Sequence, residues 1–99
     1  MFGIVIVSHS RKLAESLAWL ASEVSRAEIP LAFAGGVEGK YDESGTDATD
    51  ILAALESVYS DEGVIIFTDM GSAILSAELA LELAGDEKKK NIYISSAPL

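Results

Sequence analysis

The apolar positions of the chain fall into four short clusters that are rich in β-branched residues and bounded by polar or glycine-containing segments. They lie at residues 2–8, 30–34, 64–68 and 92–95. In two of them, at residues 4–7 and 64–67, every position is apolar, which is typical of parallel strands covered on both faces. The clusters therefore predict four strands of a mostly parallel sheet.

Three longer segments between these strands repeat apolar residues every three or four positions, as amphipathic helices do. They lie at residues 11–25, from just after Thr46 to about 58, and at 72–84. Thr46 is a residue type that caps the N-terminus of a helix well, and Gly85 is placed to end the third helix. We therefore expect three helices, one in each connection between consecutive strands.

The alternation of strands and helices predicts an α/β fold. Right-handed crossovers would build a doubly wound, mostly parallel four-stranded sheet in the order 2-1-3-4, with helices on both faces. The glycine-rich segment from Gly35 to Gly45 permits positive φ angles and close approach of another backbone. We expect one domain over residues 1–99. Because the chain stops shortly after a strand, we also expect that a C-terminal helix is missing or that another copy covers this part of the sheet.

Composition and charge exclude several classes of function. Apolar residues make up 49% of the 99 residues, which is enough for one core, and the absence of cysteine excludes disulfides, thiolate metal sites and thiol catalysis. The net charge of −9 argues against nucleic-acid binding. Three lysines at residues 88–90 predict a solvated turn, with docking of an acidic partner as the lesser alternative. No apolar run is long enough to cross a membrane and no export signal opens the chain, so we expect a cytoplasmic protein.

The candidate chemistry lies at the ends of two strands that the order 2-1-3-4 makes neighbours. His9 follows the first strand and Asp69 follows the third. Because ligands of open α/β sheets gather at the carboxyl ends of the strands where the order reverses, we expect these side chains to meet. A carboxylate that accepts the proton of one imidazole nitrogen makes the other nitrogen the nucleophile. His9 and Asp69 are therefore the predicted catalytic residues, and Nε2 is the expected nucleophile if Asp69 holds the Nδ1 proton.

Two predicted helix N-termini point toward the same place and would bind phosphate oxygens. The first helix begins near Ser10, and the third begins near Gly71 and Ser72. The backbone N–H groups at these two helix starts and the hydroxyls of Ser10 and Ser72 are the candidate phosphate ligands. Thr46 is a further candidate, and a plain helix cap is its alternative. Arg11 and the lysine after it would help an incoming phosphate beside the histidine, with plain surface charge as the alternative. The structural alternative for the whole site is that the histidine and the aspartate only cap helices.

Several segments of the chain resemble one known family, the phosphotransferase subunits of bacterial dihydroxyacetone kinases. They are GIVIVSHS at residues 3–10 followed by LAE at 13–15, GTD at 45–47, DMGSA at 69–73 and SAPL at 96–99. The family has serine where this chain has Asp47, often glycine where it has Ser16, and leucine where it has Met70. The segments cover the whole chain in the family's order.

The resemblance implies the fold of mannose-type enzyme IIA domains of the phosphoenolpyruvate-dependent phosphotransferase system. It implies that His9 receives phosphate from the histidine-containing phosphocarrier protein. The phosphate then passes to ADP bound on the nucleotide-binding subunit of dihydroxyacetone kinase. Members are generally homodimers, and this subunit itself binds no metal and no nucleotide cofactor.

Two other functions are compatible with the same fold class. A mannose-type IIA domain can instead serve a sugar permease or a transcriptional regulator, although the GSA at residues 71–73 favours the dihydroxyacetone system. A flavodoxin-like module or a response-regulator receiver is a different class. A receiver needs acidic residues at the end of its first strand, where this chain has Ser8 and His9.

Overall fold

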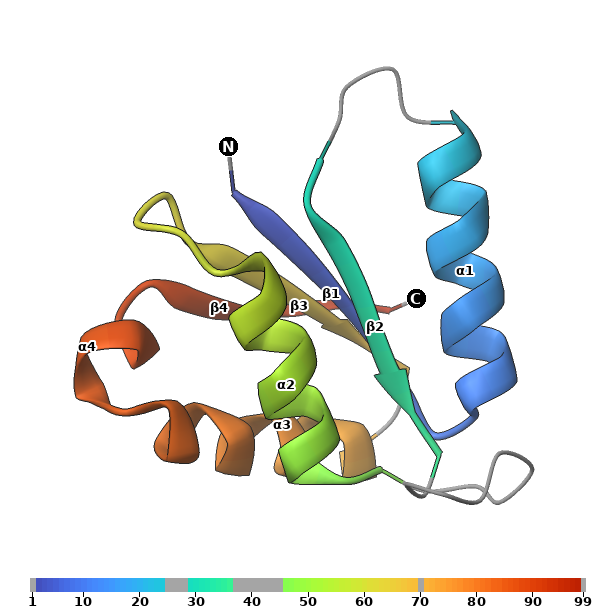
Figure 1. The fold of residues 1–99 in the computed structure, drawn as a ribbon. Coiled ribbons are helices and arrows are strands. Elements are labelled where there is room, and N and C mark those ends of the chain that lie inside the picture. The colour runs from blue at the N-terminus through green and yellow to red at the C-terminus, as the bar shows by residue number, and fades with distance from the viewer. Residues whose placement is uncertain (1, 25–28, 37–45, 70, 99) are drawn as a thin grey trace.

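The computed structural model describes residues 2–24, 29–36, 46–69 and 71–98 (Figure 1). Strands and helices alternate along the chain, as the apolar pattern predicts. In chain order they are β1 (Gly3–Ser8), α1 (Arg11–Val24), β2 (Leu31–Gly35), α2 (Ala48–Val58), β3 (Val64–Thr68), α3 (Gly71–Ala84), α4 (Asp86–Lys89) and β4 (Ile92–Pro98). All four predicted strands and all three predicted helices are present.

The strands form one sheet in the order β2-β1-β3-β4, and every pair is parallel. This confirms the predicted order and places the first and third strands side by side. In their register Val7 pairs with Thr68, so the residues that follow these two strands emerge next to each other. On the other side of β1, Ser8 pairs with Gly35 at the end of β2.

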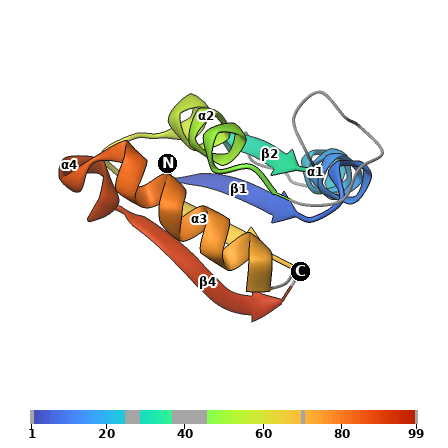
Figure 2. The same cartoon turned by 90° about the horizontal axis from the view of Figure 1, so that it is seen from below.

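Helices cover both faces of the sheet, as expected for a doubly wound fold. On one face, buried residues of α2 and α3, such as Leu55 and Ala77, pack with Val5, Val7 and Ile66 of the sheet. On the other face, Ala14 and Ala18 of α1 pack against Ile6. In Figure 1, α2 and α3 are adjacent and α1 stands on the far side of β2, and Figure 2 shows the same arrangement from below. The core therefore has two parts, separated by the sheet.

The start of α2 differs from the prediction. Asp47, not Thr46, is the N-cap, because its carboxylate accepts from the backbone N–H of Thr49 at 2.9 Å and from the Thr49 hydroxyl at 2.6 Å. The hydrogen bond from the Thr49 side chain is the largest cause that holds the pKa of Asp47 below its ordinary value. Residue 25, predicted to close the first helix, lies outside the described residues. Gly85 directly follows α3 with a φ of 94°, which favours glycine, but its ψ of 159° is not the left-handed helical value of a C-terminal cap, and it is the N-cap position of α4.

The lysine cluster also differs from the prediction, because part of it is the short helix α4 rather than a turn. Each of its lysines forms an ion pair with a glutamate of the same chain. The pairs are Lys88 with Glu56 at 3.2 Å, Lys89 with Glu82, and Lys90 with Glu87 at 3.4 Å. Lys88 and Lys89 therefore connect α4 to α2 and α3, whereas Lys90 pairs locally with Glu87, so the trio is not an isolated basic patch. Within the described ranges, no helix has the length and apolar character that crossing a membrane requires.

Candidate functional site

His9 and Asp69 meet at the carboxyl ends of β1 and β3, which confirms their predicted proximity. The ring Nδ1 of His9 lies 2.6 Å from Oδ2 of Asp69. The Asp69 side chain is largely buried, with 12% of its surface exposed, whereas the His9 side chain is 41% exposed. Within the described part of the chain, His9 Nε2 has no hydrogen-bond partner. The arrangement holds one ring nitrogen on a carboxylate and leaves the other open to an incoming group.

The Asp69 carboxylate is a shared acceptor for the end of β1. The Ser8 hydroxyl donates to Oδ2 at 2.7 Å, and the backbone N–H of His9 lies 3.3 Å from both carboxylate oxygens. Burial acts to raise the pKa of Asp69, but the hydrogen bonds from Ser8, from the His9 ring and from the His9 backbone outweigh it and lower the pKa. Asp69 is therefore an anion at neutral pH and accepts a hydrogen bond from the Nδ1–H group of the His9 ring.

The loop that carries His9 is fixed by hydrogen bonds of Ser8 and Ser10 and by close contact with Gly35. The backbone N–H of Ser10 donates to the Ser8 hydroxyl at 3.0 Å, and the Ser10 hydroxyl accepts from Leu13 N–H at 3.3 Å, so Ser10 caps α1. A Cβ on Gly35 would lie only 2.6 Å from the Ser8 carbonyl oxygen. Only glycine lets the end of β2 approach the loop this closely, and Gly36 after it has a φ of 69°. The rest of the predicted glycine-rich segment, residues 37–45, lies outside the described residues.

Arg11 follows the loop and is engaged by α2. Its Nη2 lies 2.8 Å from Oδ2 of Asp50, and the same oxygen accepts from the Gly35 N–H at 3.3 Å. Asp50 thus connects the first turn of α1, the end of β2 and the first turn of α2. In this arrangement the guanidinium of Arg11 pairs with Asp50, although Arg11 is only two residues from His9 in the sequence.

The other predicted phosphate ligands lie at the start of α3. Gly71 and Ser72 lie in its first turn, and both are exposed. They come shortly after Asp69, which follows the last residue of β3. The Thr46 hydroxyl lies 2.6 Å from Ser76 Oγ and 3.4 Å from the Ser72 carbonyl oxygen. Thr46 therefore connects the approach to α2 with the first turns of α3, and its own contacts are with α3.

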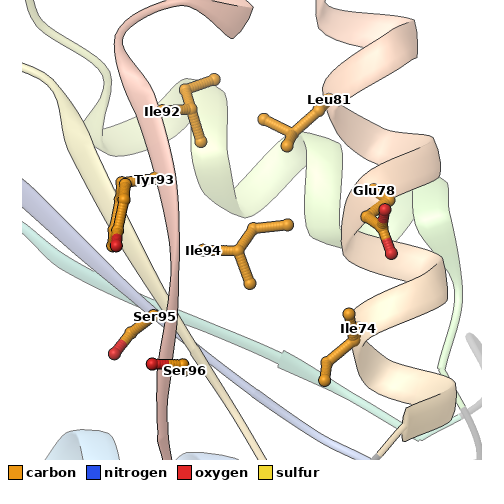
Figure 3. Close-up of a pocket in the computed structure, with 8 residues that line it drawn as sticks. All are labelled: Ile74, Glu78, Leu81, Ile92, Tyr93, Ile94, Ser95 and Ser96. Carbon is orange, nitrogen blue, oxygen red and sulfur yellow. The ribbon is translucent and has the colours of Figure 1, made fainter.

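Two hollows lie on the β4 side of the site. The smaller, about 180 Å³, touches Asp69 and is lined by Thr68, Asp69, Gly71, Ile74, Ser95, Ser96 and Ala97. The larger, about 460 Å³, is a mostly apolar groove between α3 and β4, where Ile74 and Leu81 face Ile92 and Ile94 (Figure 3). Only the smaller one shares residues with the His9 site. In the described part of the chain, no three His, Asp or Glu side chains gather in a way that could hold a metal ion.

Sequence reasoning missed three residues of the site: Ser8, Gly35 in its contact with the loop, and Asp50. Ser8 has a recognisable signal, because it is a polar residue in the last position of an otherwise apolar strand. A polar side chain in such a place needs a buried partner. Asp50 has no such signal, because an acidic residue in the first turn of a helix is common.

Comparison with known families identifies the fold group. The family model EIIA-man, described as "PTS system fructose IIA component", matches residues 3–99. The chain belongs to this family. The expected likeness to mannose-type enzyme IIA domains is thereby confirmed, together with the parallel sheet order that it implies.

The curated relatives of the chain all belong to one kind of subunit within this family. The phosphoryl donor subunits DhaM of PEP-dependent dihydroxyacetone kinase from Providencia stuartii and Escherichia coli are 39% and 40% identical to this chain over 100 residues. These matches cover 100% of the chain but only 21% of each relative, so the chain spans about a fifth of their length. A subunit of the same kind from Listeria innocua, of dihydroxyacetone kinase 2, is 39% identical, and 78% of it is covered. The resemblance found in the sequence motifs is confirmed.

A solved structure has the same fold. The crystal structure of the protein of unknown function EF1359 matches with a TM-score of 0.85 and 29% identity, covering 100% of this chain and 75% of that one.

Proposed function

We propose that the chain is a phosphohistidine relay of a phosphoenolpyruvate-dependent dihydroxyacetone kinase. His9 accepts a phosphoryl group from the histidine-containing phosphocarrier protein and donates it to ADP on the nucleotide-binding kinase subunit. The observation that carries the proposal is the 2.6 Å contact between His9 Nδ1 and Asp69, with Nε2 unpartnered among the described residues. The relatives are named phosphoryl donor subunits of this kinase, which supports the same role here.

The chemistry follows from the positions of the protons. With Nδ1–H donating a hydrogen bond to Asp69, the neutral His9 ring presents a lone pair at Nε2. Nε2 attacks the phosphorus of the donor phosphohistidine, so that a new N–P bond forms while the donor's N–P bond breaks. Positive charge builds on the His9 ring as its bond forms, and the Asp69 carboxylate stabilises that charge through the Nδ1 proton. In delivery to ADP, a terminal phosphate oxygen of ADP attacks the phosphorus, so that a new O–P bond forms while the Nε2–P bond breaks and the His9 ring becomes neutral again.

The phosphoryl oxygens need donors beside Nε2. We assign this role to the beginnings of α1 and α3, whose free N–H groups favour an anion. The Ser10 N–H already donates to Ser8, so at the start of α1 Ser10 contributes through its hydroxyl proton. Gly71 and Ser72 form the first turn of α3. Thr46 belongs to the same proposal because its hydroxyl lies against Ser72 and Ser76 of α3. The proposal further includes residues 1–99 as one domain, a homodimer, and a cytoplasmic location in which the phosphocarrier is met.

The test is transfer of label from phosphoenolpyruvate. The protein is incubated with enzyme I, the phosphocarrier protein and radiolabelled phosphoenolpyruvate, and acid-labile label is measured on wild type and on His9→Ala. Label on wild type and none on His9→Ala is the expected result. Equal label on both proteins would overturn the assignment of His9.

The acceptor is tested by adding the ADP-loaded nucleotide-binding subunit to the purified phosphoprotein. Loss of label from His9 with formation of labelled ATP is expected. If the label stays on the chain, the phosphate acceptor is a different protein, such as a sugar permease or a transcriptional regulator. The assignment to dihydroxyacetone kinase then fails, while the proposal that His9 carries phosphate stands.

A further inference from the structure

Ser8 is a buried polar residue in a strand where packing alone favours an apolar one. Its side chain is 0% exposed, and Ser8 and Thr68 are the polar residues that the described ranges bury. Its neighbours in β1 are isoleucine and valine. Because a buried hydroxyl costs free energy unless it is hydrogen-bonded, the site must supply partners for it.

The Ser8 hydroxyl acts both as a hydrogen-bond donor and as an acceptor at the candidate site. Its proton is donated to Asp69 Oδ2 at 2.7 Å, and its oxygen accepts the Ser10 N–H at 3.0 Å. The hydroxyl therefore bridges the carboxylate that faces the His9 ring and the peptide that follows His9. The Ser8 oxygen thus contacts both the Asp69 carboxylate and the backbone of the His9 loop, and these two groups determine where the His9 ring lies.

The hydrogen bonds of Asp69 show what the Ser8 bond adds. The His9 backbone N–H lies 3.3 Å from Oδ1 and 3.3 Å from Oδ2, so this long contact does not distinguish the two oxygens. The torsion that rotates a carboxylate is broad and has no sharp minimum of its own. The 2.7 Å bond from Ser8 is made to Oδ2 alone, and Oδ2 is the oxygen that meets His9 Nδ1. Ser8 thus selects the rotation of the carboxylate.

We propose that Ser8 is a positioning residue for the relay, which aligns Asp69 Oδ2 with His9 Nδ1 and so keeps the ring proton on Nδ1. The proposal rests on the proposed phosphoryl transfer at His9. Ser8 does not touch the reacting nitrogen; it acts through the carboxylate. Its bond also withdraws charge from Oδ2 and is the largest of the interactions that lower the pKa of Asp69. The carboxylate consequently accepts a hydrogen bond from the ring without taking the proton away.

The test compares Ser8→Ala with wild type in the unphosphorylated protein first. His9 is the only histidine of the chain, so ¹⁵N labelling of histidine reports its two ring nitrogens without overlap. We expect wild type to hold the proton on Nδ1 and Ser8→Ala to show an increased fraction protonated at Nε2, with faster exchange of the Nδ1 proton. We also expect the rate of phosphoryl acceptance to fall by about tenfold, the low end of what one hydrogen bond to a charged group contributes.

Two further variants keep the result interpretable. Ser8→Cys retains nearly the same volume with a weaker donor, so it should move the ring signals in the same direction even where Ser8→Ala does not fold. Ser22→Ala is the matched control, because its hydroxyl donates to the backbone oxygen of Trp19 on an exposed part of α1. We expect Ser22→Ala to leave both the ring signals and the rate of acceptance unchanged.

The outcomes separate this proposal from the proposed function. If wild type takes up label and the Ser8 variants keep wild-type ring signals and rates, the Ser8 proposal is overturned and the relay stands. If wild type takes up no label on His9, the relay itself is overturned, and the role of Ser8 in it falls with it. Shifted ring signals together with slowed acceptance support both.

Discussion

Asp69→Asn removes the charge that faces His9 while keeping the shape of the side chain. The carboxylate accepts from the Ser8 hydroxyl, from the His9 ring at 2.6 Å and from the His9 backbone N–H. An asparagine has one oxygen and one NH₂ group, so in either orientation a donor of the amide faces a donor of the site. If the NH₂ faces the ring, His9 must accept at Nδ1 and carry its proton on Nε2, where the phosphoryl group should arrive.

The size of the effect follows from the strength of the hydrogen bond that the substitution removes. This bond joins a largely buried carboxylate to the ring, and hydrogen bonds to charged groups contribute about 1.5–3 kcal/mol. At about 1.4 kcal/mol for each factor of ten, we expect phosphoryl acceptance to slow by roughly 10- to 150-fold. The fold should persist, since the change adds no volume.

The assay is the initial rate of label uptake from the phosphorylated carrier protein, measured by rapid quench at neutral pH. Asp61→Asn is the matched control, because it makes the same chemical change at an exposed position in the turn before β3. We expect Asp61→Asn to react at the wild-type rate. A rate for Asp69→Asn within twofold of wild type would refute the role assigned to this carboxylate.

Three other perturbations test the framework around the site. Gly35→Ala places a Cβ 2.6 Å from the Ser8 carbonyl oxygen, and we expect a loss of about 1–3 kcal/mol in unfolding free energy by urea titration, with slower phosphoryl acceptance. Arg11→Gln and Asp50→Asn break a partly exposed ion pair, and a double-mutant cycle should give a coupling energy of about 0.5–1 kcal/mol. Hydrogen bonds from Ser8 and His9 hold the pKa of Asp69 below its ordinary value in the folded chain, so its charge stabilises the fold above the unfolded-state pKa, and this contribution is lost as the pH falls through the folded pKa. The excess unfolding free energy of wild type over Asp69→Asn should shrink accordingly in acid.

Each of these predictions has an outcome that contradicts it. Gly71→Ala adds a Cβ that meets nothing within 4 Å, so it should leave the unfolding free energy near wild type, and an equal loss at both glycines would count against the close approach at Gly35. A coupling energy of zero between Arg11 and Asp50 would mean that the ion pair does not hold α1 to α2. A ¹³C titration that places the pKa of Asp69 at or above the ordinary value of an aspartate would contradict the direction of its shift.

Much of the fold follows from local pattern and general topology. Fully apolar runs mark β1 and β3 as central strands, and right-handed crossovers then leave few possible strand orders. That order brings His9 to Asp69 across 60 residues of sequence, so the centre of the site is predictable without any contact being known. The prediction works because the carboxyl ends of parallel strands share one edge.

The remaining features of the fold and the site depend on distances between atoms, which the pattern of apolar and polar residues does not contain. Thr46 and Asp47 are both good capping types, and only the reach of the Asp47 carboxylate to Thr49 decides between them. The helix α4 has four residues, too few for a helical period to be visible. The bond from Arg11 to Asp50 joins residues on two helices, so it appears only when both helices are placed.

The most direct test of the account is the position of the phosphorus in the phosphorylated protein. Phosphorus and nitrogen NMR on ¹⁵N-histidine protein, loaded from phosphoenolpyruvate through enzyme I and the carrier, identifies the bonded nitrogen of the single histidine. The account predicts one phosphohistidine, with phosphorus bonded to His9 Nε2 and a proton retained on Nδ1 opposite Asp69. Phosphorus bonded to Nδ1, or to any residue other than His9, would contradict it.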